Sequence, residues 1–88
     1  SNVAVLVEDA PSEHQLAHMG GAESRGELFG LFESDELMPD RITLFRLPLG
    51  AACENEDELF GEIRVTLVHE FAHHFGIDDD RLDELGWS

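Results

Sequence analysis

The most regular hydrophobic pattern in the chain lies between residues 56 and 75. Apolar side chains recur there at steps of three and four residues, the spacing of one face of an α-helix. Asn55 precedes this stretch as a candidate N-cap, and Glu58 lies at capping-box distance from it. The pattern predicts a long helix whose buried stripe contains Phe60, Ile63, Leu67, Phe71 and Phe75, widened by Val68 and Ala72.

Three shorter segments have the composition of β-strands. Residues 2–8 are mostly apolar and β-branched, which predicts a buried strand. Residues 28–33 predict a second strand, in which Gly30 indicates an edge or a bulge. Residues 41–46 alternate between polar and apolar positions, as expected of a third strand. One long helix and about three strands predict an α+β domain, with a small mixed sheet packed on that helix.

The remaining segments are short. Pro48 and Gly50 are expected to close the third strand, and residues 12–19 predict one or two helical turns. A glycine-rich, polar stretch over residues 20–26 predicts a mobile loop, and residues 80–85 predict a final helix ended by Gly86.

Composition narrows the class of protein. The 88 residues suffice for one small domain, and the apolar content of 42% is that of a globular chain. The formal net charge of −15 makes nucleic acids and anionic membrane surfaces poor partners. The single cysteine, Cys53, excludes a disulfide framework, and no apolar run is long enough to span a membrane. We therefore expect a cytoplasmic protein that binds neither nucleic acid nor membrane.

The candidate chemistry lies at the end of the predicted long helix. The sequence H-E-x-x-H-x-x-G-x-x-D begins at His69, and its second histidine is His73. Residues i and i+4 lie above one another on a helix, so both imidazoles can bind one Zn²⁺ ion. Glu70 is one step round the helix, where it can hold a water bound to the metal. Gly76 can end the helix and turn the chain so that Asp79 becomes the third ligand, which leaves the fourth position for water.

Several neighbouring residues have competing interpretations. Asp78, Asp79 and Asp80 all stand where the final helix needs an N-cap, and we assign the cap to Asp78 or Asp80 and the metal to Asp79. His74 is interpreted as a residue that supports the site or packs beside it. Two further histidines with helical spacing are interpreted as exposed residues near a loop, with an auxiliary metal or substrate contact as the alternative; they are His14 and His18.

These motifs resemble those of the minimal zincin-like metallopeptidases found in actinobacteria. The resemblance covers residues 2–9, 39–45 and 62–87, and the last of these segments, which carries the histidine motif, is the most specific. It implies one compact zincin domain over residues 1–88, without the N-terminal helix that members of the family usually carry. It also implies that zinc is bound by His69, His73 and Asp79 and that Glu70 is the catalytic base. The motif is similar to that of metzincins as well, with Asp in place of the final His.

The resulting hypothesis is a zinc metalloendopeptidase whose substrate is a peptide or protein. Glu70 would take a proton from the attacking water and deliver it to the leaving amine. The chain has no tyrosine, so a helper for the oxyanion is His74, Arg81 or none. Two alternatives stay open at this point. One is a catalytically silent, zinc-stabilised interaction module, and the other is a zinc hydrolase that acts on a non-peptide amide or ester.

Overall fold

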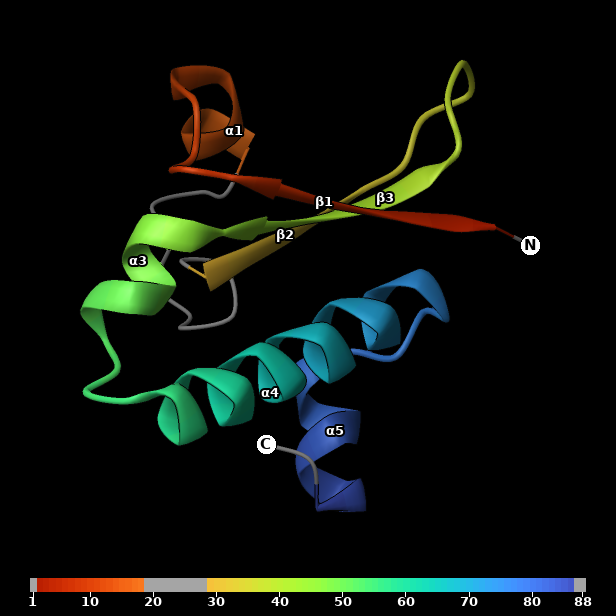
Figure 1. Ribbon diagram of the computed structural model, residues 1–88. Helices are drawn as coiled ribbons and strands as arrows, with labels where there is room; N and C mark the ends of the chain where they lie inside the picture. The colour runs from red at the N-terminus through yellow and green to blue at the C-terminus, as the bar shows by residue number, and fades with distance from the viewer. Residues whose placement is uncertain (1, 19–28, 87–88) are drawn as a thin grey trace.

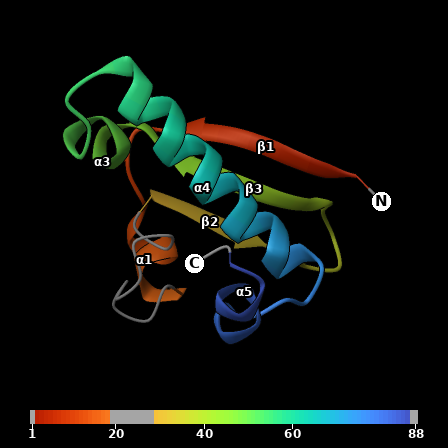
Figure 2. The ribbon, with the colours of Figure 1, turned by 90° about the horizontal axis from the view of Figure 1, so that it is seen from below.

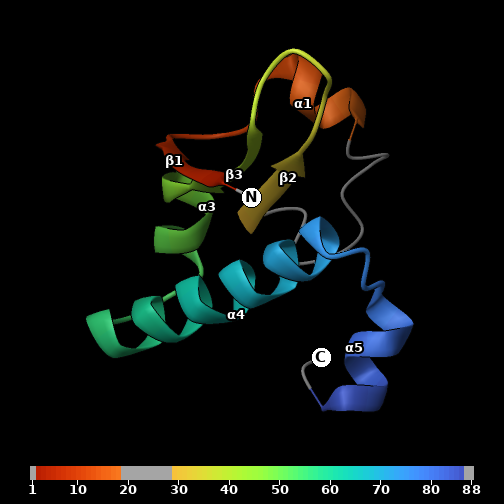
Figure 3. The same ribbon diagram turned by 90° about the vertical axis from the view of Figure 1, so that its right-hand side faces the viewer.

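The computed structural model describes residues 2–18 and 29–86, and these form an α+β domain built in layers (Figure 1). One face of the sheet carries the long helix α4, and the small helix α1 lies on the other side (Figures 1 and 3). The expected loop over residues 20–26 lies outside the described residues. In chain order the elements are β1 (Val3–Glu8), α1 (Glu13–His18), β2 (Gly30–Glu33), β3 (Asp40–Phe45), α3 (Arg46–Ala51), α4 (Glu56–His74) and α5 (Asp79–Leu85).

The sheet has three strands in the order β1-β3-β2 and is mixed, as predicted. The central strand β3 pairs in parallel with β1, where Val5 lies opposite Ile42, and antiparallel with β2, where Phe32 lies opposite the same residue. Because it has neighbours on both sides, β3 supplies much of the buried surface. Its buried residues are Ile42, Thr43, Leu44 and Phe45.

The helix α4 runs across the face formed by β2 and β3 (Figure 2). Its N-terminal half packs leucine and isoleucine side chains against an apolar cluster that includes Leu44 and Leu49. Asn55 caps the helix as predicted, because its Oδ1 accepts a hydrogen bond from the N–H of Glu58 at 2.9 Å. The Glu58 carboxylate reaches back to the N–H of Glu54 at 3.1 Å, one residue earlier than the capping box predicts.

The predicted stripe of α4 is wrong at both ends. Phe60 is 63% exposed and Phe75 is 72% exposed, whereas Thr66 and Glu70 are buried almost completely. In the second half of α4, the residues that face the sheet are therefore polar, and the helix is rotated about its axis relative to the orientation that the apolar stripe predicts. Glu70 can be buried because β2 offers its carboxylate the N–H of Phe32, a contact that the spacing of apolar residues does not reveal.

Two further sequence predictions need correction. The sequence predicts that β1 is buried, but Val5, Leu6 and Val7 are 48%, 42% and 64% exposed. β1 is the edge strand at the side of the sheet away from α4, which packs on β2 and β3. The sequence predicts a third strand over residues 41–46 that Pro48 and Gly50 close, yet Arg46–Ala51 forms the helix α3. Pro48 fits there because it lies in the first turn, where backbone N–H groups need no intrahelical partner.

The end of α4 and the start of α5 form as the sequence predicts. Gly76 has φ +74°, and the hydrogen bonds Ile77 N–H to Ala72 O (2.8 Å) and Gly76 N–H to His73 O (3.0 Å) form a Schellman motif. Gly86 ends α5 in the left-handed conformation. In all three views α5 and β1 lie on opposite sides of α4 (Figures 1–3).

Within residues 2–18 and 29–86, no helix combines the length and the hydropathy that crossing a membrane requires.

Candidate metal centre

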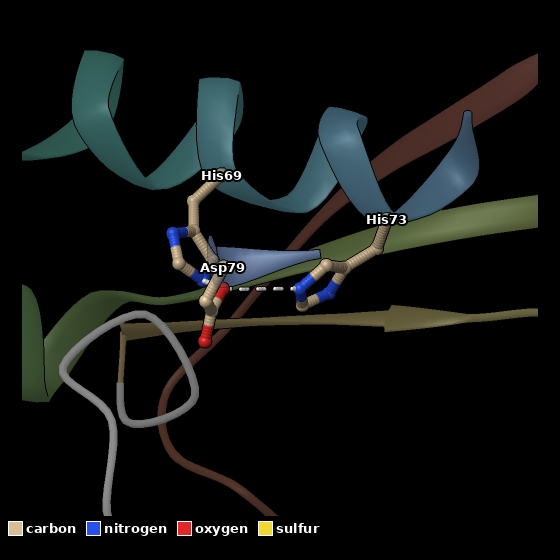
Figure 4. Close-up of side chains that lie close together, drawn as sticks. All are labelled: His69, His73 and Asp79. Carbon is tan, nitrogen blue, oxygen red and sulfur yellow. Dashed lines mark ion pairs between the residues drawn. The ribbon is translucent and has the colours of Figure 1, made fainter. Parts of the chain in front are cut away.

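Three of the residues singled out in the sequence come together beside α4. His69 and His73 point from the helix toward Asp79, which is the first residue of α5 (Figure 4). His69 Nε2 lies 2.9 Å from Asp79 Oδ1, and His73 Nε2 lies 3.8 Å from the same oxygen. One ligand atom from each residue lies within 4.8 Å of the other two. Tetrahedral zinc, with bonds of about 2.0–2.1 Å, holds its ligand atoms roughly 3.3 Å apart, so the arrangement fits such an ion.

The turn between α4 and α5 separates two neighbouring carboxylates. Asp78 Oδ1 accepts a hydrogen bond from the N–H of Arg81 at 2.9 Å, so Asp78 is the N-cap of α5. The next residue, Asp79, is thereby left to face the two histidines. The Schellman motif that ends at Ile77 fixes the direction from which this segment returns to α4. Asp78, one of the two caps that the sequence allows, therefore caps α5, and Asp79 faces the two histidines.

An open hollow of about 300 Å³ adjoins the cluster. It is lined by His73 and by the turn itself, including Gly76, Ile77 and Asp79. His69 is 18% exposed and His73 is 32% exposed at the side chain, while the Asp79 side chain is 60% exposed. The ligand atoms can therefore be approached from solvent, and a molecule in the hollow would lie against the cluster.

Glu70 is buried beside the cluster, with only 1% of its surface exposed. Its Oε1 accepts a hydrogen bond from the backbone N–H of Phe32 at 3.0 Å and lies 3.3 Å from His73 Nδ1. Its Oε2 is also buried and has no hydrogen-bond partner in the described part of the chain. The carboxylate is thus anchored through one oxygen, and the second oxygen retains its capacity to accept a proton.

The hydrogen bond with Glu70 raises the pKa of His73 above its ordinary value, and the Asp79 carboxylate adds to this effect. The same contact fixes the ring, because a histidine that binds a metal through Nε2 commonly donates Nδ1–H to a carboxylate. A bound cation would take the place of the proton that Asp79 attracts to Nε2. The donor set of two imidazoles and one carboxylate is one that suits zinc.

Gly30 allows β2 to approach the site, a role that the sequence analysis did not assign to it. A Cβ atom at this position would lie 2.6 Å from Thr66 Cγ2 and 3.5 Å from Glu70 Cγ. A side chain here would therefore force either Thr66 to turn or β2 to move away from α4, and a shift of β2 would disturb the hydrogen bond between Phe32 and Glu70. Glycine within a strand is the signal for such close approach, although it does not identify the approaching element.

His74 and Arg81, the two candidate oxyanion helpers, each have a polar partner outside the cluster. His74 Nδ1 is bonded to Asp40 at 2.6 Å, and the guanidinium of Arg81 lies 3.8 Å from Glu84. His14 lines a different cavity, of about 350 Å³, and is not part of the candidate metal group found among the described residues; the side chain of His18 lies outside the description.

Comparison with known proteins gives one informative result. Residues 1–87 match the family model described as zincin-like metallopeptidase. No curated protein sequence matches the chain at a significant level.

Proposed function

The chain belongs to the family of zincin-like metallopeptidases, and on that premise we propose that it is a zinc-dependent endopeptidase. The observation that supports this function most strongly is the convergence of His69, His73 and Asp79 beside a buried glutamate with one unpartnered oxygen. We assign the three converging residues as the zinc ligands. When bound, zinc supplies a Lewis acid that polarises the scissile carbonyl and lowers the pKa of a coordinated water.

We assign Glu70 as the general base. Its Oε1 is held by the N–H of Phe32, so the proton acceptor in this assignment is Oε2. Glu70 takes a proton from the water that attacks the peptide carbonyl and then delivers it to the leaving amine. The anchored oxygen would keep the carboxylate in one orientation during both transfers.

The edge of β2 is where we expect an extended peptide to bind. β2 is an edge strand of the three-stranded sheet, and the backbone N–H of its residue Phe32 donates a hydrogen bond to the proposed base. A peptide that adds a strand to this edge would place its backbone next to the catalytic carboxylate. The net charge of −15 supports a peptide or protein substrate over nucleic acid or an anionic membrane. The single cysteine of the sequence, which leaves no second cysteine for a disulfide within the chain, fits a cytoplasmic protein.

Cleavage of a peptide library by zinc-loaded protein tests the proposal. Wild-type protein should cut members of the library, and a chelator should abolish the cleavage. Glu70→Gln should lower the rate by about 10²- to 10⁴-fold, the usual contribution of general acid–base catalysis, with zinc content unchanged. The matched control is Glu36→Gln, which makes the same change in an exposed loop and should leave the rate unaltered.

Equal cleavage by wild type and Glu70→Gln would disprove the assigned base. Cleavage of small esters or amides but of no peptide would instead make the protein a hydrolase of a different substrate class. If zinc binds stoichiometrically and nothing is cut, the proposed enzymatic function is wrong, and the site would serve to stabilise an interaction module.

A further inference from the structure

The sequence from His69 to His74 contains two interleaved pairs with i, i+4 spacing. One pair is His69 and His73, which face Asp79. The other pair is Glu70 and His74, which lies one step round the helix on the neighbouring face. The first pair belongs to the proposed metal site, so the contacts of the second pair show how the site is attached to the rest of the domain.

The second pair holds the β2–β3 hairpin at two points. Glu70 Oε1 accepts the hydrogen bond from Phe32 N–H. One helical turn later, His74 Nδ1 lies 2.6 Å from Asp40 Oδ2, and its ring meets the ring of Phe32 edge to face at a centroid distance of 5.9 Å. Both residues therefore bind the hairpin that forms the edge of the site, and they do so from the same face of α4.

Asp40 is itself fixed in place. Its second oxygen, Oδ1, accepts a hydrogen bond from Ser34 Oγ at 2.7 Å. The hydrogen bond from Ser34 and the contact with His74 lower the pKa of Asp40, which favours the ionised form. The side chain of His74 is only 10% exposed, so this contact is shielded from water more than a surface ion pair. Ser34, Asp40 and His74 form a short chain of polar contacts between the hairpin and the last turn of α4.

The contact between His74 and Asp40 lies next to a proposed ligand, so it can affect where that ligand points. His74 is the last residue of α4, immediately after His73. Helix ends fray because their last carbonyl groups lack intrahelical partners. A bond from this residue to the sheet limits both fraying and rotation of the final turn, and rotation of that turn would move His73 away from Asp79.

We propose that His74 and Asp40 are positioning residues for the metal centre, acting together to hold the last turn of α4 against the β2–β3 hairpin. They touch neither the cation nor the substrate in this role. The inference rests on the proposed assignment of His69, His73 and Asp79 as zinc ligands. It adds a definite cause for the orientation of His73 and a function for the second histidine of the His-His pair.

Metal binding by purified variants tests this proposal without any need for a substrate. Zinc affinity is measured by competition with a chelator, and the visible absorption of the Co²⁺-substituted protein reports the geometry of the ligands. His74→Phe keeps a ring beside Phe32 but loses the nitrogen. It should weaken zinc binding by about 10- to 100-fold, as is usual when a partner of a metal-binding residue is removed, and should alter the Co²⁺ bands.

Two further variants distinguish positioning from general loss of stability. His74→Asn can still bond to Asp40 through its amide and should recover most of the affinity and the wild-type Co²⁺ bands. The double variant His74→Phe with Asp40→Ala should bind zinc no more weakly than the weaker of the two single variants, because both changes break the same contact. Asn55→Ala, which removes the cap at the far end of α4, should lower the melting temperature but leave the Co²⁺ bands unchanged.

The outcomes separate this inference from the proposed function. Wild-type affinity and Co²⁺ bands in His74→Phe would overturn the positioning role while leaving the peptidase proposal intact. A fall in peptide turnover with unaltered Co²⁺ bands would also overturn it, because His74 would then act on the substrate. Additive losses in the double variant would show that His74 and Asp40 act independently. If wild-type protein binds neither metal, the ligand assignment fails, and the inference fails with it.

Discussion

The two halves of α4 are held to the domain by different chemistry. In the first half, Leu59 and Ile63, followed by Leu67 just past the midpoint, pack on the apolar cluster of Phe29, Leu44 and Leu49. In the second half, the sheet-facing residues Glu70 and His74 are polar, and they bind backbone and side-chain atoms of the β2–β3 hairpin. The same helix is thus anchored by hydrophobic burial at one end and by directed hydrogen bonds at the other.

This difference explains why the proposed chemistry lies at the C-terminal half. Hydrophobic contacts are non-directional and tolerate some rotation of the helix. Hydrogen bonds to a buried carboxylate and a buried imidazole require a defined geometry, and a metal centre requires the same. The apolar half can therefore provide stability, while the polar half sets the orientation of the residues around Asp79.

Removing one ligand should have the largest effect, and it should be confined to the polar half. His73→Ala leaves only two of the three proposed ligands, so zinc affinity should fall by more than the roughly 10- to 100-fold typical of residues outside the ligand set. Stability measured with zinc present should also fall, because metal binding is linked to folding. Elemental analysis that finds undiminished stoichiometric zinc in this variant would refute the ligand assignment.

Truncation in α3, on which the first half of α4 packs, should show the opposite profile. Leu49 belongs to the apolar cluster and is 3% exposed, so Leu49→Ala should lower the free energy of unfolding by about 2–5 kcal/mol. Because the change is remote from the metal centre, the zinc affinity of the folded protein should alter by no more than about 0.5 kcal/mol. Denaturant unfolding and calorimetric zinc titration measure the two quantities separately.

Leu47→Ala is the matched control for this truncation. Leu47 lies in the same helix but is 51% exposed, so its loss should change the free energy of unfolding by no more than about 0.5 kcal/mol. Similar destabilisation by the two variants would mean that the packing ascribed to the N-terminal half is incorrect. A large loss of zinc affinity in Leu49→Ala would show that the two halves are not separable.

A smaller but more specific effect is expected at Gly30, where β2 meets the polar half. Gly30→Ala introduces a Cβ atom 2.6 Å from Thr66 Cγ2, and overpacking of this kind costs about 1–3 kcal/mol. Because Thr66 is itself buried, we expect β2 to shift, so the hydrogen bond between Phe32 and Glu70 should weaken, and peptide turnover should fall more than zinc content does. Thr66→Ala removes the closest contact but leaves the new Cβ atom 3.3 Å from the carbonyl oxygen of Thr43, so the double variant should recover part of the stability. A stable, fully active Gly30→Ala would contradict the close approach.

The sequence predicted most of the elements because their signals are local. The N-cap at Asn55, the glycine stop at Gly76 and the spacing of His69 and His73 all lie within a few residues of the structure that they specify. The sequence also narrowed the N-cap of α5 to Asp78 or Asp80, and the cap is Asp78. The role of Asp79 as a ligand stays a prediction.

The parts that the sequence missed depend on contacts between distant positions. Phe32 and Glu70 are 38 residues apart, and Asp40 and His74 are 34 residues apart. These contacts set the rotation of α4, which is why Phe60 and Phe75 are exposed despite their apolar spacing. The exposure of β1 has a similar cause, because strand order decides which apolar strand lies at an edge.

The central claim is that the turn after α4 brings Asp79 to the two histidines to complete a zinc site. Calorimetric zinc titration of three proteins tests it most directly. Wild type and Asp78→Ala should each bind one equivalent, although Asp78→Ala should lose about 1 kcal/mol of stability with its helix cap. Asp79→Ala should bind zinc far more weakly than either. Tight binding by Asp79→Ala together with weak binding by Asp78→Ala would contradict the account, because the cap and the ligand would then be reversed.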